Sequence, residues 1–190
     1  MRSILLFVIF CVWAVPSLAA EAGANDFFSG FMHPVLGFDH LLAMVAVGLL
    51  SVQIGGWAIW VVPAAFVGFL AVGGVLGLYA IDLPHVEGAI AISVLALGFV
   101  IAARASLPAV VAMAIVGFFA IFHGHAHGME IPRLAEPWKY VLGFMLASAV
   151  LHLSGVLIGL IGRREILRAQ LGAGIAGIGL HMALLTYAMI

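Results

Sequence analysis

Two histidine-rich stretches hold the residues of this sequence that are best suited to chemistry. The stretch "HPVLGFDHLLAM", residues 33–44, contains His33, Asp39 and His40 at the start of a long apolar run. The stretch "FHGHAHGME", residues 122–130, closes another apolar run with three histidines and a glutamate. Imidazole and carboxylate groups without thiolates suit Ni, Co, Zn, Cu or Fe ions better than Mg²⁺ or Ca²⁺. Because only neutral imidazole binds metal, we expect binding to weaken as the pH falls through about 6.5.

The spacing of the first stretch predicts a shared helix face. His33 and His40 are seven residues apart, which is two helical turns, and Met44 follows one turn later. We expect Pro34 in the first turn of this helix, where its missing N–H costs little. An unpaired, ionised Asp39 would be costly inside a membrane, so it must face a partner, a cation or water.

The second stretch predicts another shared face if its helix continues. His123, His127 and Glu130 follow one another at spacings of four and three, whereas His125 points elsewhere. The glycines beside these histidines leave open whether the helix continues or unwinds and offers carbonyl oxygens to a cation. A solvated loop end is the alternative interpretation of this cluster.

The composition is typical of a membrane protein. Of 190 residues, 66% are hydrophobic and 8% are charged, and the near-zero net charge gives no indication of nucleic-acid binding. The apolar runs approach the length needed to cross a bilayer. We therefore predict an all-α membrane protein, a compact bundle of six transmembrane helices. We place the spans near 34–52, 57–80, 86–104, 107–125, 138–161 and 168–189.

The first residues have the features of a cleavable signal peptide. Arg2 precedes an apolar core, and small residues follow where a signal peptidase cuts, so we expect cleavage after Ala19 or Ala20. The expected division is a signal peptide at 1–20 and one six-helix transmembrane domain at 21–190. An uncleaved additional helix is the alternative.

Basic residues in the short loops predict the orientation. Arg104 follows the third span, and Arg163, Arg164 and Arg168 lie between the last two, so these loops should be cytoplasmic. Six crossings then place both mature termini outside the cytoplasm, in the periplasm or the exterior. The opposite, outer loops contain a smaller cluster, His85 and Glu87.

Both motifs resemble those of the HupE/UreJ family of nickel and cobalt permeases. The family's first-helix pattern is His, five residues, then Asp-His, and it is matched by His33, Asp39 and His40. The fourth-helix pattern is Phe-His-Gly, a variable residue, a small residue, His-Gly, a variable residue and Glu. Residues 122–130 match it, with His125 at the first variable position.

This resemblance implies uptake of Ni²⁺ or Co²⁺ across the inner membrane, in company with hydrogenases or ureases. The protein would be a transporter rather than an enzyme, with the divalent ion as cargo and no permanent cofactor. The metal-binding residues would be His33, Asp39, His40, His123, His127 and Glu130. The preferred ion, the energy coupling, homo-oligomer formation and cytoplasmic nickel or cobalt recipients stay open, as do the roles of His85, Glu87 and His125.

A different class of function would use two histidines outside the motifs. His152 and His181 lie in the last two predicted spans and could serve an intramembrane metal- or haem-binding protein or an enzyme. "HLSG", residues 152–155, faintly resembles part of an intramembrane Ser–His dyad. The predicted depths of Ser154 and His181 differ too much for such a dyad. Helix–helix hydrogen bonds are an equally good interpretation of both histidines. In a permease, His152 and His181 could also serve deeper handovers of the ion.

Overall fold

The computed structural model describes residues 26–131, 137–161 and 165–188, and all of the regular elements in these ranges are helices. The predicted signal peptide at 1–20 lies outside the described residues. The helices are α2 (Asp26–Leu36), α3 (Phe38–Ile54), α4 (Ala58–Leu78), α5 (Val86–Ala102), α6 (Ala109–Glu130), α7 (Pro137–Ile161) and α8 (Glu165–Ala188).

Helix length separates the elements that can span a membrane from those that cannot do so alone. Helices α4, α6, α7 and α8 are long and apolar enough, and the bent pair α2–α3 counts as a fifth if it forms one span. Helix α5 is apolar but has 17 residues, or about 26 Å against a hydrocarbon core of about 30 Å. The all-helical prediction is confirmed for the described residues. Helix length and composition support four spans, or five with the bent pair, rather than the predicted six.

The first predicted span, 34–52, is wrong as a single helix. The chain breaks at Gly37, and the axes of α2 and α3 differ by 76°. Gly37 is extended, with φ −72° and ψ 104°, and its N–H donates to the His33 carbonyl at 2.9 Å. Pro34 lies inside α2 near its end rather than in a first turn. His33 and His40 therefore sit on two different helices and do not share one helix face.

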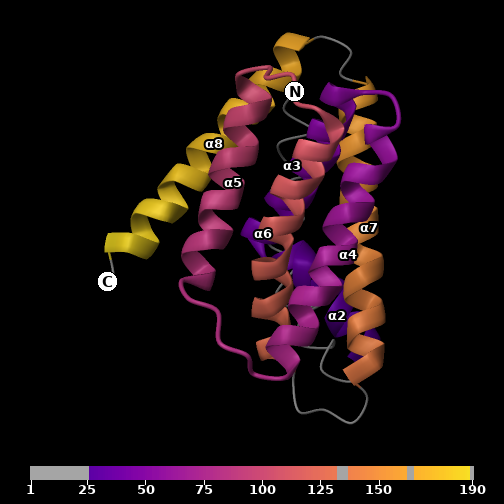
Figure 1. Ribbon diagram of the computed structural model, residues 1–190, viewed down its shortest axis with the longest axis vertical. Coiled ribbons are helices and arrows are strands. Elements are labelled where there is room, and N and C mark those ends of the chain that lie inside the picture. Colours follow the sequence, from indigo (N-terminus) through magenta and orange to yellow (C-terminus); the bar gives the residue numbers. More distant parts are fainter. Residues whose placement is uncertain (1–25, 132–136, 162–164, 189–190) are drawn as a thin grey trace, which may run out of the picture.

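The helices pack mainly as three pairs around α3, namely α4 with α6, α5 with α8 and α2 with α7. Figure 1 shows α5 and α8 side by side at one edge, with α4 and α7 on the other side of the molecule. Helix α4 packs mainly on α6, and α7 packs on α2 and α3. Helix α3 contacts all three pairs, and its side chains Met44, Val47 and Leu50 are buried in the core.

Glycines bring α4 and α6 into backbone contact. A Cβ atom at Gly73 would collide with the carbonyl oxygen of Ile121, and one at Gly124 would collide with that of Leu70. Such close approach is how small residues join helices in lipid. Helix α6 continues through Gly124 and Gly128 to Glu130, so these glycines serve packing rather than unwinding.

A side chain added within the α4–α6 backbone contact should destabilise the bundle. We expect Gly73→Ala to cost roughly 1–3 kcal/mol, because the added methyl group must displace backbone atoms. Gly68→Ala on the same helix is the matched control, since a Cβ there meets nothing within 4 Å. The measurement is Tm in detergent, which should fall by several degrees for Gly73→Ala only. Equal Tm values for both variants would contradict the assigned packing.

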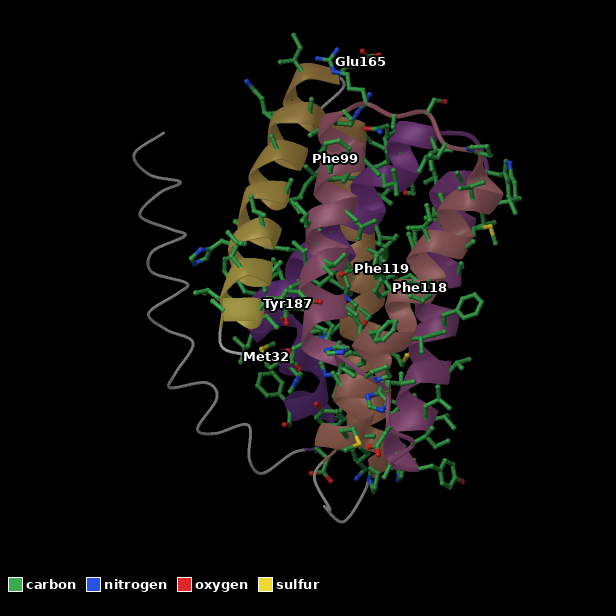
Figure 2. All side chains as sticks on the ribbon, turned by 60° about the vertical axis from the view of Figure 1, so that its left-hand side comes forward. Met32, Phe99, Phe118, Phe119, Glu165 and Tyr187 are labelled. Carbon is green, nitrogen blue, oxygen red and sulfur yellow. The ribbon has the colours of Figure 1, made fainter. Side chains whose placement is uncertain are left out.

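The two ends of the bundle differ in chemistry. At one end, Gln53 donates to the carbonyls of Val100 and Ala105, and Arg104 lies 3.6 Å from Glu165 in an exposed ion pair. Figure 2 shows Glu165 at this end, with Met32 and Tyr187 well away from it. Helix α4 begins near Gln53 and leads away from this end. After its far end, the Ile81 carbonyl of the α4–α5 loop meets His125 of α6, so the end of α6 lies at the opposite, histidine-bearing end.

Candidate metal centre

Four histidines from three helices form a continuous row. The ring centroids lie 4.7 Å apart for His33 and His127, 4.1 Å for His127 and His40, and 4.6 Å for His40 and His123. His33 on α2 is partly exposed, His127 and His40 are 4% and 6% exposed, and His123 is fully buried. The row therefore runs from the edge of the molecule into its interior, and both sequence motifs contribute to it.

Asp39 fixes the orientation of the His40 ring. Its Oδ1 accepts from the His40 backbone N–H at 2.7 Å and from His40 Nδ1 at 2.6 Å. Because an ionised carboxylate only accepts, Nδ1 carries the hydrogen and Nε2 keeps a lone pair. His40 Nε2 is buried and has no hydrogen-bond partner within the described part of the chain. A carboxylate that anchors a ligand histidine in this way is common around protein-bound metals.

Ser93 of α5 anchors His123 in the same manner. The Ser93 hydroxyl donates to the Ile90 carbonyl at 2.7 Å, so its oxygen accepts from His123 Nε2 at 2.8 Å. His123 Nδ1 then keeps a lone pair, and it is buried without a partner among the described residues. Sequence reasoning missed Ser93, whose only signal was a lone hydroxyl within an otherwise apolar helix.

His125 points away from the row, as its position in the sequence predicted. Its Nε2 donates to the Ile81 carbonyl at 2.7 Å, which ties the α4–α5 loop to the end of α6. His127, two residues later, instead packs against His33, His40 and Phe144. Alternate histidines of the second motif thus have different surroundings.

The row opens beside a cavity of about 170 Å³ between α4, α6 and α7. His127 lies in its wall, together with Tyr140 and Phe144 of α7. The rest of the lining is apolar side chains and glycines of the α4–α6 contact. The cavity gives the outer part of the row space that the tightly packed inner part lacks.

Comparison with known proteins shows the family of this chain. The family model described as "HupE / UreJ protein" matches residues 6–182. The chain belongs to the HupE/UreJ family. It is 46% identical to Protein HupE of Rhizobium leguminosarum bv. viciae over 167 aligned residues. The alignment covers 86% of each of the two chains. No solved structure matches the chain significantly.

The histidine row of this HupE/UreJ protein is not a closed metal cage. Among the described side chains, no three of the His, Cys, Asp and Glu groups converge so as to hold one ion. Glu130 ends α6, but its side chain lies outside the described part of the structure. The row therefore presents separate nitrogen lone pairs, as at His40 and His123, rather than one preformed coordination sphere.

The other sequence candidates lie away from the row. His85 and Glu87 are exposed at the start of α5, beside a cavity of about 240 Å³ that Tyr187 also lines. His152 is buried on α7, whereas His181 is exposed on α8. Helix α7 packs on α2 and α3, and α8 packs on α5, so a haem shared by these two histidines has no support in the packing.

Proposed function

We propose that this HupE/UreJ protein is a permease that transports Ni²⁺ or Co²⁺ across the bacterial inner membrane into the cytoplasm. The observation that supports this function best is the row of imidazoles from partly exposed His33 to fully buried His123. The divalent ion is the cargo, and the protein acts as a transporter rather than an enzyme. The motif resemblance to nickel and cobalt permeases points to the same ions.

Separate lone pairs suit transport better than a closed cage does. An ion must bind strongly enough to enter a pathway and weakly enough to leave it. His40 Nε2 and His123 Nδ1 each offer one nitrogen, on rings whose centroids are 4.6 Å apart. Imidazole nitrogens favour Ni²⁺ and Co²⁺ over Mg²⁺, which requires oxygen ligands and gives up water reluctantly.

Carboxylates provide the negative charge that a divalent ion needs in the membrane. The Asp39 side chain is 22% exposed beside His40, so it can face an ion that still keeps part of its water shell. Moving such an ion away from water without a counter-charge would be strongly unfavourable. We propose Glu130 as the second carboxylate, because it follows His127 by three residues on α6.

The charge distribution supports an orientation in which the histidine row faces the periplasm. Arg104 and Arg168 lie at the end opposite the histidine row, and the positive-inside rule assigns that end to the cytoplasm. The row then opens toward the periplasm. We propose that α2–α3 and α5 each complete a crossing, which gives six spans and two periplasmic termini after removal of residues 1–20.

The direct test is uptake of radioactive nickel into proteoliposomes that contain the purified protein. We expect uptake above that of protein-free vesicles, inhibited by excess Co²⁺ and not by excess Mg²⁺. Vesicles with the double variant His40→Ala/His123→Ala provide the matched control for leakage. Uptake that equals this control, in tight vesicles of known orientation, would contradict the proposal.

The two neighbouring histidines of α6 should differ in their effect on uptake. His127→Ala removes a member of the row, and we expect uptake to fall by about tenfold or more, as for a residue around a metal. His125→Ala removes the bond to the Ile81 carbonyl and should loosen the α4–α5 loop with a smaller effect on uptake. Initial rates in matched vesicles decide the ranking, and the reverse order would overturn the assigned surroundings.

A further inference from the structure

His152 on α7 is a buried histidine that the row does not include. It is 1% exposed, and its Nδ1 lies 2.5 Å from the carbonyl oxygen of Ser148, four residues earlier. A carbonyl oxygen only accepts, so Nδ1 carries the hydrogen and Nε2 keeps the lone pair. His152 Nε2 is buried and has no hydrogen-bond partner in the described ranges. His152 thus has the anchored ring and bare nitrogen of His40 and His123.

A single aromatic ring links His152 to the inner end of the row. Phe66 of α4 is fully buried, and its centroid lies 5.7 Å from that of His123 and 5.0 Å from that of His152. His123 and His152 come from different helices, yet both pack on this ring. Phe66 is therefore a shared contact of the two imidazoles and links the inner end of the row to His152.

His152 also reaches a second cavity, nearer to the basic end. This cavity of about 430 Å³ lies between the first half of α4 and the second half of α7, and His152 is in its wall. The cavity that includes His127 lies along the second half of α4. Because α4 begins at the basic end, the two cavities follow one another along α4, and the one that His152 lines is the nearer to the basic end.

We propose that His152 is an inner metal-binding residue of the transport path, which receives the ion from His123 past Phe66. The step is a ligand exchange in which His152 Nε2 replaces His123 Nδ1 on Ni²⁺ or Co²⁺, with no change of oxidation state. The inference rests on the proposed transport function. A purely structural role needs only the Nδ1 bond to Ser148 and gives no reason to bury an unpaired Nε2, which is costly.

The first test distinguishes the roles of the two ring nitrogens of His152. His152→Asn can still donate to the Ser148 carbonyl but lacks the Nε2 lone pair. We expect nickel uptake in proteoliposomes to fall by about tenfold or more. His181→Asn, which removes the exposed histidine of α8, is the matched control and should retain wild-type uptake. Wild-type uptake by His152→Asn would overturn the inference.

The second test detects the ion at this position without relying on transport. In the purified full chain, His152→Cys would place a thiolate there, and bound Co²⁺ should give a thiolate-to-metal charge-transfer band in the near ultraviolet. The wild-type protein is the baseline, because the single cysteine of the sequence, Cys11, lies in the predicted signal peptide, and Leu153→Cys is the neighbouring control. Identical spectra for the three proteins would overturn the inference.

The outcomes also separate the inference from the proposed function. Failure of the wild-type protein to take up nickel would overturn the proposed function itself. Nickel uptake by wild type, lost in His40→Ala and unchanged in His152→Asn, would leave that function in place and overturn only the role of His152. Loss of uptake in His152→Asn together with the new band in His152→Cys would support both.

Discussion

Replacement of His40 or Asp39 by alanine is expected to abolish nickel uptake while the protein still inserts into the membrane. His40→Ala removes the Nε2 lone pair at the middle of the row. Asp39→Ala removes the acceptor that holds His40 Nδ1–H at 2.6 Å and the charge beside it. Loss of such an anchoring carboxylate alone typically costs about 10–100-fold in metal affinity. Uptake into proteoliposomes, with the amount of inserted protein measured in parallel, checks this result.

Milder replacements separate ligand, anchor and charge. His40→Asn keeps a donor for Asp39 but lacks the Nε2 lone pair, so uptake should still be lost. Asp39→Asn keeps an oxygen acceptor without the charge, so its uptake should lie between wild type and Asp39→Ala. Asp82→Ala removes an exposed acidic residue of the α4–α5 loop and should leave uptake unchanged. Normal uptake by both alanine variants would exclude a transport role for this pair.

Local spacing predicted much of the candidate site because α6 is a regular helix. His123 and His127 are four residues apart, so a helix places them one turn apart on one side. The structure brings both against His40, and it turns His125 toward Ile81. Composition likewise predicted the helical class, because long apolar runs leave few other options in a membrane.

Local spacing could not predict the break between α2 and α3. The seven-residue interval between His33 and His40 fits a continuous helix, but the chain bends by 76° at Gly37. As a result, His33 packs on His127 of α6 and on Tyr140 of α7. Gly37 is the sequence signal for the bend, and a Cβ there would lie 3.2 Å from Asp39 Oδ1 and 3.3 Å from His40 Nδ1. The consequences of the bend depend on helices far away in the sequence.

The Ser93 anchor of His123 was also beyond sequence reasoning. Ser93 is 30 residues from His123, and only the packing of α5 on α6 brings its hydroxyl to the ring. A serine in an apolar helix more often bonds to its own backbone, as Ser51 and Ser148 do. Ser93 makes that bond to Ile90 and also accepts from His123, which distinguishes it from the other two.

Because Ser93 accepts from His123, we expect substitutions of either residue to have a strong effect on nickel uptake. His123→Gln can still donate to the Ser93 oxygen but lacks the Nδ1 lone pair, so we expect nickel uptake to be lost. Ser93→Ala keeps that lone pair but frees the ring to change its tautomer and orientation. We expect it to raise the nickel concentration for half-maximal uptake by about 10-fold or more, as for other residues that anchor metal ligands. Initial uptake rates across a range of nickel concentrations distinguish the two effects.

Ser148→Ala is the matched control for the loss of a buried hydroxyl. Its side chain bonds only to the Phe144 carbonyl in the interactions that the structure describes, and the bond from His152 goes to the Ser148 backbone. Ser148→Ala should therefore keep the half-maximal concentration of wild type. An equal shift in Ser93→Ala and Ser148→Ala would mean that general packing, rather than the tautomer of His123, sets the affinity. A selective shift in Ser93→Ala would place His123 Nδ1 on the path of the ion, because the remote hydroxyl reaches the metal only through that ring.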